Sequence, residues 1–268
     1  MSTMSAPLTD SRIMLRRNVK HILRNPVTIF NGALMPVVVM LLLVYVFGRA
    51  FNVGERYIEY ATPGLILLAI SYGLSGTAVS VSSDMTKGII NRFKVMNVSR
   101  GAVLTGHMVA TMAGSLIAVA VIISMAFALG FRSAATVGDW LGAIGIIAAT
   151  AFAAAWLTVA LGMAAKTPES AGLTVVPLML LPFVSSAIVP AAKMGEGIRQ
   201  FAQYQPFTPI IESLRGLLAG TPSAGTLSAG TASGGTPLAQ NVAVALAWCA
   251  GTALVGYLWS RATFSRRA

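Results

Sequence analysis

The chain has 268 residues, of which 56% are hydrophobic and only 10% are charged, and its formal net charge is +11. A soluble domain usually carries about 25% charged residues, so this composition indicates a membrane protein. The positive charges flank apolar runs and form no single basic surface, which argues against nucleic acid as a partner. The single cysteine, Cys249, excludes an intramolecular disulfide, and no Cys/His spacing typical of a metal site is present.

The first predicted element is an amphipathic helix at 10–25, in the stretch DSRIMLRRNVKHILRNP. Its apolar residues can share one helical face while its basic residues crowd the other, and Pro26 ends the pattern. This pattern is typical of a helix that lies on the inner leaflet and is attracted to anionic membrane lipid. Two interpretations stay open: a membrane anchor alone, or a helix that also touches a cytoplasmic partner.

Six apolar runs follow, each near the length of about 20 residues that crosses a bilayer, and none contains Asp, Glu, Lys, Arg or His. They predict one all-α membrane domain over 1–268 with six transmembrane helices. The fifth run contains Pro177, Pro182 and Pro190, so we expect a broken helix whose freed carbonyls need donors from neighbouring elements. The runs lie at about 27–48, 61–82, 108–129, 140–163, 171–192 and 242–260.

The Lys and Arg residues in the connections predict the orientation. With both termini on one side, the connections on that side carry 13 Lys and Arg residues and the opposite connections carry six. The positive-inside rule therefore predicts cytoplasmic termini. The long connection between the fifth and sixth runs is then external.

The cytoplasmic connection at 84–106 is the first of two informative loops. Its apolar residues, which include Ile90, Phe93 and Met96, fall near helical spacing, and basic residues surround them. An amphipathic helix with an exposed aromatic residue can enter a groove of a partner protein. A surface helix that lies on lipid is the alternative.

The external stretch at 196–220 is the second informative loop. From Phe207 onward its apolar residues form a helical stripe, with Thr208 as a predicted cap and Pro209 in the first turn. Glu212 and Arg215 are expected to pair on the wetter side. A preceding helix, with Pro206 at the bend, would complete a re-entrant hairpin, although a helix lying flat on the outer surface is also possible. The following segment, 221–240, is rich in Gly, Ser, Thr and Ala and predicts a flexible external loop.

Several motifs in order make the chain resemble a known family. The sequence contains LRNP, YVFG and YATPG, then Asp84, Arg92-Phe93, Ser99-Arg100 and Gly106-His107, and finally Pro206, Pro209, Arg215 and Gly220. It resembles the permease subunit of type-2 ABC exporters, in the daunorubicin/doxorubicin-resistance group. Two positions depart from the family pattern: Asn97 replaces a proline and His107 replaces an arginine.

The resemblance implies a role for each loop. The cytoplasmic loop would hold a coupling helix that contacts the partner ATPase, and the external hairpin would roof the translocation path as a gate. The implied gate residues are Pro206, Pro209, Glu212 and Arg215. The implied ATPase contacts are Lys87, Ile90, Arg92, Phe93, Lys94, Met96 and Arg100.

The chain contains no G-x-x-x-x-G-K-[ST] sequence to bind phosphates, so we expect no catalytic residues and no cofactor on it. ATP and Mg would belong to a separate ABC ATPase subunit. Two ATPase copies and a homodimer of this chain are expected, in a bacterial plasma (inner) membrane. The cargo would be hydrophobic or amphipathic, such as a drug or a lipid-linked molecule. Hydroxyls of the second run could line its path or could bond neighbouring helices: Ser71, Tyr72, Ser75, Thr77 and Ser80.

The alternative function is a stand-alone secondary transporter or channel. Proton-coupled carriers usually place ionisable residues inside the membrane, and the six runs contain none. A membrane-embedded enzyme would need a convergent set of Asp, Glu, His or Cys. Only two histidines, His21 and His107, are present, both expected at span edges.

Overall fold

The computed structural model describes residues 26–48, 56–87, 100–190, 193–219 and 238–267. Within these ranges every regular element is a helix. The predicted interfacial helix at 10–25 lies outside the described residues. So do 88–99 and 220–237, which contain most of the predicted coupling loop and most of the predicted external loop.

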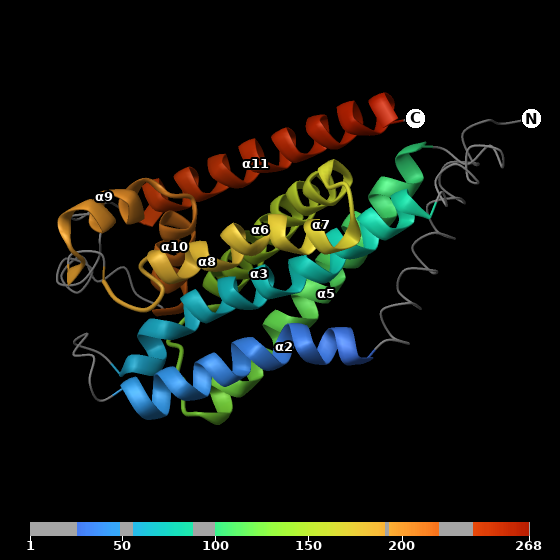
Figure 1. The fold of residues 1–268 in the computed structure, drawn as a ribbon. Helices are drawn as coiled ribbons and strands as arrows, with labels where there is room; N and C mark the ends of the chain where they lie inside the picture. The colour runs from blue at the N-terminus through green and yellow to red at the C-terminus, as the bar shows by residue number, and fades with distance from the viewer. Residues whose placement is uncertain (1–25, 49–55, 88–99, 191–192, 220–237, 268) are drawn as a thin grey trace, which may run out of the picture.

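In the part of the chain that the structure describes, four helices are long and apolar enough to cross a membrane. They are α3 (Tyr57–Thr86), α5 (Arg100–Ala128), α6 (Val137–Ala164) and α11 (Leu238–Arg267), and they run along the long axis of the molecule (Figure 1). Three of them contain a predicted run and extend beyond it at both ends, whereas α5 begins eight residues before its run, 108–129, and ends one residue short of it. Helical turns therefore continue into the expected loops: Arg100 to Gly106 belong to α5, and α11 begins at Leu238, inside the expected loop 221–240.

The first and fifth runs form shorter or interrupted elements. The first consists of α2 (Pro26–Leu41), which contains Pro36, and a π-helical segment at Leu42–Phe47. The fifth breaks into α7 (Pro168–Thr174), α8 (Val176–Leu180) and a 3-10 turn at Leu181–Val184. Proline near the start of α8 and inside the 3-10 turn limits the backbone hydrogen bonds of a continuous helix, so the predicted interruption is confirmed.

Close helix packing builds the core. At Gly256 of α11 a Cβ atom would come within 2.6 Å of the backbone nitrogen of Leu157 in α6, so only glycine allows this approach. The largest apolar cluster joins α2, α3, α5, α6, α10 and α11 and includes Met40, Leu67, Ile122 and Ile211. Small residues at such crossings are typical of helix packing in membranes, where backbones must approach closely.

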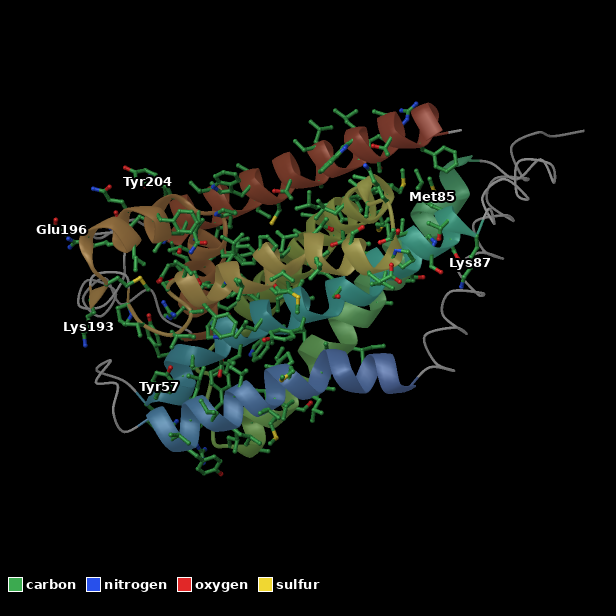
Figure 2. All side chains as sticks on the ribbon, in the orientation of Figure 1. Tyr57, Met85, Lys87, Lys193, Glu196 and Tyr204 are labelled. Carbon is green, nitrogen blue, oxygen red and sulfur yellow. The ribbon has the colours of Figure 1, made fainter. Side chains whose placement is uncertain are left out.

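Two helices fill one end of the bundle. The helices α9 (Glu196–Tyr204) and α10 (Phe207–Ala219) lie near the start of α3 (Figure 1), and α10 packs against α3, α6 and α11. Lys87 lies at the opposite end from Tyr57, Glu196 and Tyr204 (Figure 2). The two informative loops of the sequence therefore belong to opposite ends of the bundle.

Candidate functional site

The helix α10 is buried around almost its whole circumference. The apolar stripe is buried as predicted at Ile210, Ile211 and Leu214, but the opposite side is buried too. Glu212 and Arg215 expose only 3% and 8% of their surface. The prediction that these two residues occupy a wetter side is therefore wrong, because the polar side of α10 faces α3 and the broken fifth segment instead of water.

The predicted pairing within α10 is present. Arg215 Nη1 donates to Glu212 Oε1 over 2.6 Å. The guanidinium also donates through Nη2 to the carbonyl oxygens of Ser186, at 2.9 Å, and of Tyr60, at 3.2 Å. Its central carbon lies 3.9 Å from the centre of the Tyr60 ring. We call Tyr60, Ser186, Glu212 and Arg215 the Arg215 cluster. It connects three elements through one buried cation, whose charge Glu212 and the Tyr60 ring compensate.

The broken fifth segment receives donors at three alternate carbonyls. Gln205 Nε2 donates to Val184 over 2.9 Å, the Tyr60 hydroxyl donates to Ser186 over 2.9 Å, and the Tyr57 hydroxyl donates to Ile188 over 3.2 Å. Arg215 is the second donor to Ser186. Ser186 lies four residues before Pro190, so its bonds agree with the expectation that neighbours satisfy the carbonyls which the prolines free. Val184 and Ile188 do not precede a proline by four residues, so their donors serve the irregular backbone itself.

Glycine allows this segment to approach α3. A Cβ atom at Gly64 would lie 2.4 Å from the Cβ atom of Ala187. The glycine of the YATPG motif is therefore required where the fifth segment crosses α3. Tyr60, the tyrosine of the same motif, belongs to the Arg215 cluster.

The bend between α9 and α10 falls at Gln205-Pro206, as the sequence predicts. Thr208 does not precede α10 as a cap; it is the second residue of the helix, and its hydroxyl donates to the Ala202 carbonyl of α9 over 2.5 Å. Pro209 is buried in the first turn. Of the predicted gate residues, Glu212 and Arg215 are in direct contact, and the two prolines shape the bend and the first turn.

The predicted ATPase contacts lie mostly outside the described residues: Ile90, Arg92, Phe93, Lys94 and Met96. Lys87 is exposed just after the end of α3, and Arg100 is the first residue of α5. Between these helices the structure shows a contact that the sequence reasoning missed. His107 Nε2 lies 3.2 Å from Asp84 Oδ2, so His107 is not a lone interfacial histidine. The signal was available, because both residues belong to the loop motif.

The five hydroxyl residues of α3 face different neighbours. Thr77 Oγ1 lies 2.9 Å from Thr111 Oγ1 of α5, whereas Ser75 is directed toward Gly172 of α7. Ser71 is buried, and Tyr72 packs against the apolar core. Ser80 is partly exposed. Of the five, Thr77 thus contacts a neighbouring helix through its hydroxyl.

Among the residues that the structure describes, no group of three or more His, Cys, Asp or Glu side chains is placed to hold a metal ion. The ionisable groups of the Arg215 cluster already bind each other and backbone carbonyls. Such an arrangement stabilises a join between helices. A catalytic site of the acyl-transfer type places a nucleophile beside a base, and the Arg215 cluster contains no such arrangement.

Comparison with known proteins gives the family. The model of the ABC-2 type transporter family matches residues 9–219. A daunorubicin resistance ABC transporter permease protein of Streptomyces coeruleorubidus is 28% identical over 201 residues, which cover 73% of this chain and 70% of that protein. A probable doxorubicin resistance ABC transporter permease protein of Mycobacterium tuberculosis is 26% identical over 204 residues, covering 74% of this chain and 73% of that protein. The chain therefore belongs to the ABC-2 type transporter family and is a multi-pass membrane permease of the ABC exporter class.

Proposed function

We propose that this permease, as a homodimer with two copies of a cytoplasmic ABC ATPase, exports a hydrophobic or amphipathic drug-like or lipid-linked cargo across a bacterial plasma membrane. The observation that carries the proposal is the family match over residues 9–219, which includes both informative loops. ATP and Mg would be bound by the ATPase. The relatives named for daunorubicin and doxorubicin resistance support a drug-like cargo.

The proposed topology has six crossings and cytoplasmic termini. The broken segment from Pro168 to Pro190 would form the fifth crossing, because it connects α6 to the end of the bundle that contains α9 and α10. The helices α9 and α10 would then lie at the external end. In α9, Ile198, Phe201 and Tyr204 are more than half exposed, which suits contact with the outer lipid interface.

The homodimer would cover part of the apolar surface that one copy leaves open. Along α11, Leu254, Val255 and Leu258 are each more than half exposed. On α2 and its π-helical extension, Met35, Tyr45 and Val46 are similarly exposed. Lipid would cover the remainder of this surface. Cross-linking between copies through cysteines placed on α11 and α2, carried out in the membrane, tests the homodimer. Recovery of the chain only as an uncross-linked monomer would contradict it.

The experiment that tests the function is co-expression with the ATPase encoded nearest to the chain. The complex would be purified into lipid nanodiscs for ATP hydrolysis and prepared as inverted membrane vesicles for doxorubicin uptake. We expect stable co-purification, hydrolysis and uptake. Phe93→Asp should abolish co-purification while leaving membrane insertion intact, because a carboxylate in an apolar groove is costly.

Arg132→Asp provides the matched control, since Arg132 is exposed in the connection between α5 and α6, away from the loop at 84–106. It should co-purify the ATPase at the wild-type level. Normal recovery of the ATPase with Phe93→Asp would reject the coupling-helix assignment. Failure of the wild-type chain to bind any candidate ATPase would favour the stand-alone transporter or channel.

A further inference from the structure

One polar contact joins α3 and α5 where the chain leaves one helix and enters the other. Asp84 lies in the last turn of α3, His107 lies in the second turn of α5, and the atoms Oδ2 and Nε2 are 3.2 Å apart. The side chains expose 18% and 9% of their surface. Because both groups are largely removed from water, their interaction is screened less than that of an exposed pair.

A second polar link lies one turn further along α5. The Thr111 hydroxyl lies 2.7 Å from the His107 carbonyl oxygen and 2.9 Å from Thr77 Oγ1 in α3. A hydroxyl can donate one hydrogen and accept another, so it can serve both partners. The two links are on the same side of α5 and set the spacing of α3 and α5 at this end.

An apolar cluster beside these links extends to two more helices. Its buried members are Val81 of α3, Leu104 of α5, Trp156, Val159 and Met163 of α6, and Phe264 of α11. Met85 and Met108, the sequence neighbours of Asp84 and His107, pack against this cluster. A displacement of either residue of the pair would therefore be felt by all four long helices, because packed cores deform little.

We propose that Asp84 and His107 are positioning residues for transport: they hold the ends of α3 and α5 together, so that a push on the connecting loop moves both helices as one unit. The proposal rests on the proposed function, in which a partner ATPase acts on that loop. Without the pair, the loop could swing relative to one helix while the other stayed in place. ATP would then be hydrolysed with less cargo moved per turnover.

The test uses the full chain with its ATPase and measures two rates with doxorubicin as the probe: ATP hydrolysis and uptake into inverted vesicles. We expect His107→Ala and Asp84→Ala to co-purify the ATPase and hydrolyse ATP at the wild-type basal rate. The uptake per ATP should fall by about fivefold or more, in the range of ordinary allosteric couplings. The double variant should be no worse than either single variant, because both remove the same contact.

Rescue separates positioning from general stability. His107→Arg supplies hydrogen-bond donors that can reach Asp84 and should restore most of the uptake per ATP. Thr86→Val is the matched control, since among the described residues the Thr86 hydroxyl bonds to the carbonyls of Ser82 and Ser83 in its own helix. It should leave the ratio unchanged. If His107→Ala does not fold, His107→Leu, which keeps much of the volume without a hydrogen-bonding group, takes its place.

The outcomes distinguish the positioning role of Asp84 and His107 from the proposed export function on which it rests. A wild-type chain that recovers no ATPase and moves no doxorubicin overturns both. A working wild type whose uptake per ATP is unchanged in His107→Ala overturns the positioning role alone. The positioning role is also overturned if uptake per ATP is as low in His107→Arg as in His107→Ala. It is overturned as well if the fall in uptake per ATP is proportional to the loss of folded protein.

Discussion

The two ends of the bundle are held together in different ways. At the end that contains α10, one arginine contacts a carboxylate, two backbone carbonyls and an aromatic ring, and its side chain is almost fully buried. At the end that contains Asp84, one 3.2 Å contact to His107 and a threonine pair bridge α3 and α5. The first end concentrates many contacts on one group, and the second distributes a few contacts along two helices.

This difference suggests different mechanical roles. A buried ion pair is costly to separate, because each partner would be left without compensation in an apolar interior. The Arg215 cluster therefore favours movement of α10, the start of α3 and the fifth segment as one body. The Asp84–His107 pair is less buried than the Arg215 cluster, and it lies at the end where we propose that the ATPase acts.

The largest expected effect comes from Arg215→Leu. It leaves Glu212 buried without its cation and removes one donor from each of two carbonyls, so we expect a loss of about 3–5 kcal/mol in stability. Thermal unfolding in nanodiscs and the yield of monodisperse protein measure this loss. Replacing both residues, as Glu212→Gln with Arg215→Leu, should cost less than Arg215→Leu alone, because no charge is then left uncompensated. Wild-type stability of the single variant would remove the basis of the comparison between the two ends.

A smaller loss is expected from Gly64→Val, which places side-chain atoms where Ala187 packs. Overpacking of this kind typically costs about 1–3 kcal/mol, and here it should separate the fifth segment from α3. Gly114→Val is the matched control, because a Cβ atom at Gly114 meets nothing within 4 Å. Equal unfolding temperatures for the two variants would show that the close crossing does not contribute to the stability of this end.

Tyr60→Phe removes one hydrogen bond to the Ser186 carbonyl and keeps the ring beneath Arg215. Because Arg215 still donates to the same carbonyl, we expect a loss near the low end for a hydrogen bond, about 0.5–1 kcal/mol. Chemical or thermal unfolding of the purified chain checks the value. A loss as large as that of Arg215→Leu would show that the tyrosine, and not the arginine, is the centre of the cluster.

The smallest effect is expected from Arg56→Ala. Arg56 pairs with Glu59, but the arginine side chain is 55% exposed, and exposed pairs contribute about 0–1 kcal/mol. The unfolding temperature should be close to that of the wild type. A large fall in the unfolding temperature would mean that burial does not determine how much an ion pair at this end contributes to stability. The contrast between buried Arg215 and exposed Arg56 would then be wrong.

The long helices could be predicted from the sequence because apolar runs of membrane length need no partner to be identified. The fifth segment could be predicted to break because proline acts locally, at Pro177 and Pro182. The surroundings of Glu212 and Arg215 could not be predicted. A helical pattern shows which residues share a face, but it does not show what that face contacts. The polar face of α10 meets the carbonyl of Ser186, and the need for that donor arises only in the folded chain. The pairing of Asp84 with His107 was missed although both residues belong to the loop motif, because their order along the chain does not by itself show that α3 and α5 bring them together.

The row of carbonyls at Val184, Ser186 and Ile188 also constrains the order of biogenesis. Its donors come from both sides in the sequence: Tyr57 and Tyr60 are synthesised before the segment, whereas Gln205 and Arg215 are synthesised after it. The Val184 carbonyl therefore gains its donor only after Gln205 has been translated. If the segment lies in the hydrocarbon before then, the unsatisfied carbonyl costs several kcal/mol. We therefore expect a chain truncated before Gln205 to leave the Val184 carbonyl without its donor and the Ser186 carbonyl with Tyr60 in place of two donors.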